Sequence, residues 1–411
     1  MRLSHWLWCL LWLSSTLLAA PTYELEFNLQ FKPQDHQAFG EIRLGAGSDR
    51  VVQLDLAMDP GRYPEVELIE GQGSVKRDGK RVLWRPQGPS VLRYRVVIDQ
   101  RRANGAYRAR YTDQWAIFRA DHVFPAASVT VRGGARSRSH VSFRGPKDWH
   151  FETPYPRAKD QRFRVDIPAR GFDRPVGWMI AGRIHVRRDV YDGTGIYVVG
   201  PRDLELRRME MLALIGHTIP HMRDAFGALP DKLLLVIGPE PMWRGGLSGP
   251  NSLFMHADRP LISTNATSTL LHELTHVITR IRGAKPSDDW LAEGLAEYYG
   301  LELVRRSGGI TQDRFDAALK WQRNWGKSIK SLRVARSRGP TTARAVVLLA
   351  ELDREMRSLT RGEVGLDDLV QRLRQQRSVS TEDFIKLAEA LAEGPLEALD
   401  TPLLTAPKAK H

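Results

Sequence analysis

The chain has 411 residues, of which 42% are hydrophobic and 27% are charged, and its formal net charge is +13 at pH 7. This balance is typical of a globular protein and excludes a fully disordered chain, a coiled coil, a collagen and a polytopic membrane protein. The single cysteine, Cys9, excludes an intramolecular disulfide and a cysteine-rich zinc finger, so a metal site must use His, Asp and Glu.

Residues 1–20 have the pattern of a secretory signal peptide. Arg2 precedes an apolar stretch over residues 6–18, and the small residues Ala19 and Ala20 follow it. The apolar stretch is shorter than the roughly 17–25 residues that a membrane-spanning helix needs. The sequence therefore predicts a secreted or periplasmic protein, with an uncleaved N-terminal anchor as the alternative.

The basic side chains are scattered along the chain, with a mild cluster from Arg132 to Lys147. They do not alternate with aromatic residues as in proteins that bind single-stranded nucleic acid. We therefore favour a solvated basic surface and expect no nucleic-acid partner and no obligate partner. Association with an anionic envelope surface stays open as an alternative.

Strands are predicted to fill the first half of the chain. One run places apolar side chains at every second position: Tyr23, Leu25, Phe27, Leu29 and Phe31. This period of two is typical of a half-buried strand, and it recurs over residues 52–56 and 92–98 between Gly/Pro/Asp turns. Residues 21–199 are therefore predicted to form an all-β, sandwich-like N-terminal domain.

After residue 199 the pattern changes to long helical segments. Apolar periodicity and capping residues predict helices over residues 204–226, 265–281 and 288–306. A short apolar run predicts a buried strand over residues 233–237. Residues 331–393 are predicted to be a helical C-terminal region, in which Ser380 and Asp383 resemble a capping box. Residues 394–411 contain three prolines and are predicted to be a flexible tail.

The motif that indicates chemistry is His272-Glu273-Leu274-Thr275-His276. Residues four apart on a helix share one face, so both imidazoles can bind one ion. Glu273 lies beside the first histidine, on the side where a bound water would sit. This pattern is typical of a zinc hydrolase, in which one helical turn supplies two ligands and a general base.

Zinc in a hydrolase needs a third protein ligand and an open fourth position. No histidine lies between His276 and His411, so the downstream ligand is expected to be a carboxylate. The segment WLAEGLAEYY offers Glu293 and Glu297, one helical turn apart. One of them can bind the ion, and the other can accept a proton from the second nitrogen of a ligand histidine.

HELTH followed by WLAEGLAEYY resembles the gluzincin metallopeptidases, especially the aminopeptidase N and glycyl aminopeptidase families. The resemblance implies a Zn²⁺ cofactor held by His272, His276 and Glu293, with Glu273 as the base and Glu297 as the partner of a ligand histidine. It also implies an α+β fold, with a thermolysin-like catalytic domain over residues 200–330 between the β-rich and helical regions. The implied substrate is a peptide or a protein.

A segment upstream resembles the substrate-binding edge of these aminopeptidases: Gly245, Gly246, Leu247 and Ser248. In aminopeptidase N a glutamate at the position of Ser248 binds the free amine of the substrate. A neutral hydroxyl cannot pair with an ammonium as a carboxylate does. Aminopeptidase and endopeptidase activity therefore both stay open, with Glu240 and Asp258 as alternative anchors for an amine.

These families also place a tyrosine downstream of the zinc helices to stabilise the oxyanion. All ten tyrosines of this chain lie at or before Tyr299, so that tyrosine is missing. The candidates to replace it are Arg344, Tyr298, Tyr299 and His256.

The sequence thus predicts a zinc metallopeptidase that hydrolyses peptide bonds through a zinc-activated water. The missing tyrosine supports an alternative, a zinc-retaining and weakly active or inactive scaffold that binds peptides or an envelope partner. A third interpretation, a basic protein that binds the envelope surface, depends on the charge alone.

Overall fold

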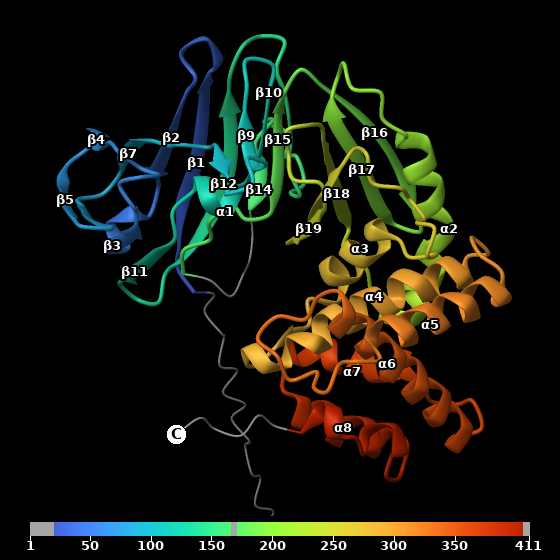
Figure 1. Cartoon of the computed structure of the whole chain (residues 1–411). Coiled ribbons are helices and arrows are strands. Elements are labelled where there is room, and N and C mark those ends of the chain that lie inside the picture. Colours follow the sequence, from blue (N-terminus) through green and yellow to red (C-terminus); the bar gives the residue numbers. More distant parts are fainter. Residues whose placement is uncertain (1–19, 166–170, 406–411) are drawn as a thin grey trace, which may run out of the picture.

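A computed structural model describes residues 20–165 and 171–405 (Figure 1). The predicted signal peptide lies almost entirely outside these residues. No helix within the described parts of the chain is both long and apolar enough to cross a membrane. The fold is α+β, as predicted, with strands in the first half and helices in the second.

The described part of the first half folds into three β-sheets that share one core. Alternate side chains of β1 (Thr22–Lys32) enter this core, as the period of two predicts: Tyr23, Leu25, Phe27, Leu29 and Phe31 are all buried. The strand orders are β14-β12-β1-β2-β7-β4, β13-β15-β10-β9-β8 and β11-β3-β6-β5. The other elements of this half are β2 (Gln37–Leu44), β3 (Val51–Ala57), β4 (Val66–Glu70), β5 (Gly73–Asp78), β6 (Arg81–Pro86), β7 (Ser90–Arg95), β8 (Gln100–Arg101), β9 (Tyr107–Tyr111), β10 (Trp115–Arg119), α1 (Ala120–Val123), β11 (Ala127–Val131), β12 (Arg136–Arg144), β13 (His150–Glu152), β14 (Phe163–Val165) and β15 (Trp178–Gly182).

The boundary predicted at residue 199 is wrong. β16 (Ile184–Tyr191) and β17 (Thr194–Pro201) belong to the second half, because β17 pairs in parallel with β18 (Lys232–Gly238). Their alternating side chains look like those of the preceding strands, and periodicity does not reveal which sheet a strand joins. The change from the first half to the second therefore lies near residue 183.

The sheet of the second half positions the candidate site. Its strand order is β16-β17-β18-β20-β19, where β20 is Ser252–His256 and β19 is Gly246–Gly249. Ile117 of β10 and Trp178 of β15 share a hydrophobic cluster with Leu234, so strands of the first half pack on this sheet. β19 is an edge strand that pairs antiparallel with β20 and contacts α3 (Thr269–Thr279).

Among the described residues, seven long helices accompany this sheet; α2 lies beside it, and α3 to α8 lie together below it in Figure 1. They are α2 (Arg208–Phe226), α3, α4 (Asp289–Arg306), α5 (Gln312–Gly326), α6 (Pro340–Leu359), α7 (Leu366–Gln376) and α8 (Thr381–Leu391). One continuous core runs from β17 through these helices, so residue 331 does not begin a separate core. The sequence did not predict α5, which carries many charged residues and buries only part of one face.

The expectation of a flexible tail is wrong for residues 394–405. Two short 3₁₀ turns, Glu397–Leu399 and Pro402–Leu404, bury leucines in the core of the helical half. The carbonyl of Leu403 accepts a hydrogen bond from the amide of Leu332 at 2.9 Å. The prolines shape turns in this segment rather than preventing it from packing.

A buried carboxylate ties the helical C-terminal region to α4. Asp288, which precedes α4 and is fully buried, accepts hydrogen bonds from the amide and the hydroxyl of Thr381 at 3.2 and 2.9 Å. Arg333 lies 3.3 Å from the same carboxylate. Loss of one partner from such a buried pair typically costs about 3–5 kcal/mol, so this link fixes where α4 begins.

Candidate metal centre

Helix α3 presents both histidines of the motif to one point. The hydroxyl of Ser268 caps the helix by accepting a hydrogen bond from the Leu271 amide at 3.3 Å. Leu270, Leu271 and Leu274 are buried in the core and fix the rotation of the helix. The Nε2 atoms of His272 and His276 then lie 3.2 Å apart.

Helix α4 adds a carboxylate to this pair. The two carboxylate oxygens of Glu293 lie 3.6 Å from His272 Nε2 and 3.6 Å from His276 Nε2, respectively. Zinc bonds of about 2.0–2.1 Å in a tetrahedral site place two ligand atoms about 3.3 Å apart. The three observed separations are close to this value, so His272, His276 and Glu293 fit a zinc ion with a fourth position open.

Glu297, one turn further along α4, orients the first histidine. Its Oε2 lies 2.8 Å from His272 Nδ1. A carboxylate that accepts a hydrogen bond from Nδ1–H holds the ring proton on Nδ1 and leaves the lone pair of Nε2 free to bind a metal. The structure therefore places Glu293 where a ligand is needed and Glu297 behind a ligand.

Burial and mutual charge shift the pKa values at this centre. Burial opposes the charged form of His272, but the neighbouring carboxylates of Glu293 and Glu297 raise its pKa to about 10. Burial and the charge of His272 lower the pKa of His276 to about 4. Burial raises the pKa of Glu273 to about 7 although the charge of His272 opposes the rise. A buried carboxyl group that titrates near neutrality suits proton uptake and release.

The edge strand β19 lies directly against Glu273. A Cβ atom on Gly246 would lie 2.6 Å from Glu273 Cγ and 2.8 Å from its Oε1, so only glycine fits here without a shift. Ser248 lies beside the Glu273 carboxylate, where its backbone amide and its side chain act to lower the pKa of Glu273. The predicted edge segment, residues 245–248, is therefore brought to the candidate base, and Ser248 contacts that base.

An arginine from the first half of the chain reaches the same edge, which the sequence did not predict. Arg119, at the end of β10, donates a hydrogen bond to the carbonyl of Ser248 at 3.4 Å. Asp121 pairs with this guanidinium at 3.0 Å. Arg119 and Ser248 are 129 residues apart, and no local pattern indicates a contact over that distance.

Two of the oxyanion candidates point away from the centre, so the prediction is wrong for both. The hydroxyl of Tyr298 lies 3.4 Å from Asp353 of α6, and that of Tyr299 donates to Asp367 of α7 at 2.8 Å. Both tyrosines are buried in the core. Positions 298 and 299 face the packed helices, whereas Glu293 and Glu297 share the other face of α4.

Arg344 lies near the start of α6, where this helix packs closely on α4. A Cβ atom on Gly294 would lie 2.8 Å from Ala345 Cβ, so α4 and α6 touch at this point. Glu293 and Arg344 are the residues that precede the two contacting positions. Among the described residues the Arg344 guanidinium has no hydrogen bond and no ion pair, and it stays a candidate for the oxyanion.

His256 belongs to a second cluster at the end of β20. Its ring is 1% exposed and lies 3.9 Å from Glu240 and 3.8 Å from Asp258. Arg244 pairs with both of these carboxylates, so its charge opposes a cation between them. The two acids that were alternative anchors for an amine thus already have a cationic partner.

The fold is shared with solved structures of low sequence identity. An aminopeptidase N family protein from Idiomarina loihiensis matches with a TM-score of 0.67 and 16% identity, over 88% of this chain and 72% of that chain. The M1 zinc metallopeptidase from Deinococcus radiodurans matches with a TM-score of 0.59 and 15% identity, over 95% of this chain and 94% of that chain. A mutant of that peptidase bound to a Tyr-Ser-Ala substrate matches with a TM-score of 0.58 and 16% identity, over 94% and 95%.

No family model matches the sequence, and no curated protein matches it either. The likeness to the solved structures therefore concerns the fold: a β-rich N-terminal region followed by a mixed region and C-terminal helices.

Proposed function

We propose that the chain is a zinc-dependent metallopeptidase of the gluzincin type, related to the aminopeptidase N family, with a thermolysin-like catalytic region. One observation carries the proposal: His272, His276 and Glu293 converge at separations that fit tetrahedral zinc. The shared fold supports it, because similar structures include zinc metallopeptidases.

The side chains of the centre have distinct roles in this proposal. Bound zinc would supply a Lewis acid that lowers the pKa of a water to about 7 and polarises a carbonyl. His272, His276 and Glu293 would hold the ion. Glu273 takes the proton of the attacking water and passes it to the leaving amine, and its pKa of about 7 suits both transfers.

The substrate is proposed to be a peptide that binds along β19. Within residues 20–165 and 171–405 no strand lies beside the outer edge of β19, so free main-chain groups there can pair with an extended peptide. A structurally similar peptidase has been solved with a Tyr-Ser-Ala substrate, which supports this substrate class. Residues 1–20 support secretion or a periplasmic location.

Metal analysis and peptide cleavage together test the proposal. The purified protein should retain about one zinc per chain and cleave peptides. Glu273→Gln should retain zinc and lose at least about 10²-fold in rate, because only the base is removed. A protein that neither retains zinc nor takes it up when zinc is added would refute the proposal.

A zinc-retaining scaffold without activity is the second candidate. It is favoured by the positions of Tyr298 and Tyr299, whose hydroxyls are engaged with core carboxylates rather than with the centre. The same experiment separates the two functions. The scaffold would contain zinc and cleave no peptide faster than Glu273→Gln does.

A further inference from the structure

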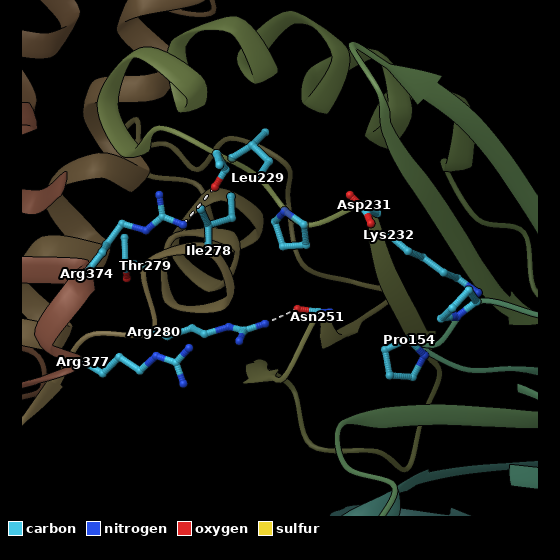
Figure 2. A pocket seen from close by; sticks show the side chains of 13 residues that line it. Pro154, Leu229, Asp231, Lys232, Asn251, Ile278, Thr279, Arg280, Arg374 and Arg377 are labelled. Carbon is cyan, nitrogen blue, oxygen red and sulfur yellow. Dashed lines mark hydrogen bonds between the residues drawn. The ribbon is translucent and has the colours of Figure 1, made fainter. Parts of the chain in front are cut away.

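A pocket of about 470 Å³ lies at the C-terminal end of α3, outside the metal centre. Its walls come from the ends of α3 and α7, the connection from α2 to β18, and the turn between β19 and β20 (Figure 2). None of the three candidate metal ligands lines it. Arg280 does line the pocket, and it lies one helical turn after His276.

Three arginines enter this pocket from the same side (Figure 2). Arg280 is the residue that ends α3, Arg374 lies in the last turn of α7, and Arg377 is the residue that ends α7. Short strand pairing between residues 282–283 and 378–379 holds the two helix ends together.

None of the three guanidinium groups meets a carboxylate among the described residues. Arg280 donates to the side-chain oxygen of Asn251, and Arg374 donates to the carbonyl of Ala228 at 2.9 Å. Both acceptors are neutral. The Arg377 guanidinium forms no hydrogen bond and no ion pair within the described parts of the chain.

The charge of the pocket is strongly positive. Asp231 is the single acid among the lining residues, against the three arginines. The remaining cation, Lys232, is engaged with Glu152 at 3.3 Å and with the carbonyl of Tyr155 at 3.2 Å.

Besides burial, the like charges of the arginines also lower the pKa values of Arg280 and Arg374. Burial and then the charge of Arg377 lower the pKa of Arg280, and burial and then the charge of Arg280 lower the pKa of Arg374. A cation at a helix C-terminus is favourable because of the helix dipole, which explains single arginines at these ends. It does not explain why three converge on one pocket without a carboxylate partner.

We propose that this pocket binds a small dianion through the guanidinium groups of Arg280, Arg374 and Arg377. Planar guanidinium groups match the oxygens of phosphates and carboxylates, and charge-assisted hydrogen bonds to them are strong. Three arginines against Asp231 leave two positive charges, which a phosphate group or a dicarboxylate balances. The volume leaves room for a small molecule that carries the dianion.

Calorimetric titration of the zinc-loaded protein with three probes at one ionic strength tests the class of anion. Inorganic phosphate and succinate are the dianions, and acetate is the monoanion. At least one dianion should bind about tenfold more tightly than acetate, since it can engage two or more guanidinium groups. The tighter dianion identifies the group, and equal affinity for all three probes would overturn the proposal.

Variants then locate the binding. The double variant Arg374→Gln/Arg377→Gln should raise the Kd of the tighter dianion at least about tenfold, because two charged donors are lost. The exposed Arg372 on the same helix does not line the pocket, so Arg372→Gln is the matched control and should bind the dianion as wild type does.

Arg377→Gln alone keeps the test valid if the double variant does not fold, because Arg377 is exposed. It should weaken binding about three- to tenfold. Unchanged affinity in Arg377→Gln or in a folded double variant would place the anion elsewhere and overturn the proposal. Zinc content and peptide cleavage should be unchanged in all three variants, which separates this proposal from the function proposed for the metal centre.

Discussion

One methyl group on β19 should displace the candidate general base without altering any metal ligand. In Gly246→Ala the new Cβ would lie 2.6 Å from Glu273 Cγ, 2.8 Å from Glu273 Oε1 and 2.9 Å from Thr269 Cγ2. Carbon atoms in contact normally lie about 3.5–4.0 Å apart, so the Glu273 side chain must move by about 1 Å.

The size of this displacement sets the expected loss of activity. A shift of about 1 Å in a catalytic group costs about 10²-fold in rate, so kcat should fall by roughly that factor. Overpacking should lower the free energy of unfolding by about 1–3 kcal/mol. None of the three atoms nearest to the new methyl group belongs to His272, His276 or Glu293, so the zinc content should stay that of wild type.

The assay combines kcat on a peptide, zinc by elemental analysis and thermal unfolding. Gly394→Ala is the control, because a Cβ there meets no atom within 4 Å. It should behave as wild type in all three measurements. A Gly246→Ala protein that cleaves at the wild-type rate would refute the contact between β19 and the base, and one that loses zinc would show that the strand supports the ligands instead.

Three further predictions follow from the centre. Glu293→Ala should abolish tight zinc binding, whereas Glu297→Ala should weaken it about 10–100-fold, as partners of ligand histidines do; zinc competition with a chelator measures both, and equal losses would contradict the two roles. Zinc binding to the metal-free protein should release about one proton between about pH 5 and 8, because the raised pKa of His272 keeps its ring protonated until zinc displaces the proton. Zinc affinity should therefore fall about tenfold per pH unit as the pH is lowered, and calorimetry in buffers of different ionisation enthalpy would detect the proton. A peptide with a free N-terminus and its N-acetylated form should be cleaved with kcat/KM values within about tenfold, because Ser248 offers no charge to an ammonium; cleavage of the free form alone would require another anchor.

The metal centre could be predicted because its main residues are related by short spacings within two helices. Four residues of spacing place His272 and His276 on one helical face, and the same spacing relates Glu293 to Glu297. Short spacings do not decide which of the two glutamates binds the metal. That choice depends on how α4 lies across α3, and the resemblance to a family indicated it before the structure placed Glu293 beside both histidines.

The features that sequence reasoning missed depend on contacts between distant residues. Arg119 reaches Ser248 across 129 positions, and β17 joins the sheet of the second half although its pattern matches the first. Periodicity reports which face of an element is apolar, but it does not report which element covers that face. Tyr298 was misassigned for the same reason, because only the packing of α4 on α6 decides where its hydroxyl points.

The packing of residues 402–404 bears on the order in which the protein matures. Arg333 reaches across 71 positions to the carbonyl of Leu404, and it also contacts Asp288 at the start of α4. During synthesis the HELTH helix emerges more than a hundred residues before this segment, and contacts of such long sequence separation form late. The support of the helix that carries Glu293 is therefore completed only when residues 402–404 have docked. We expect zinc capture to follow the folding of this half of the protein rather than to guide it.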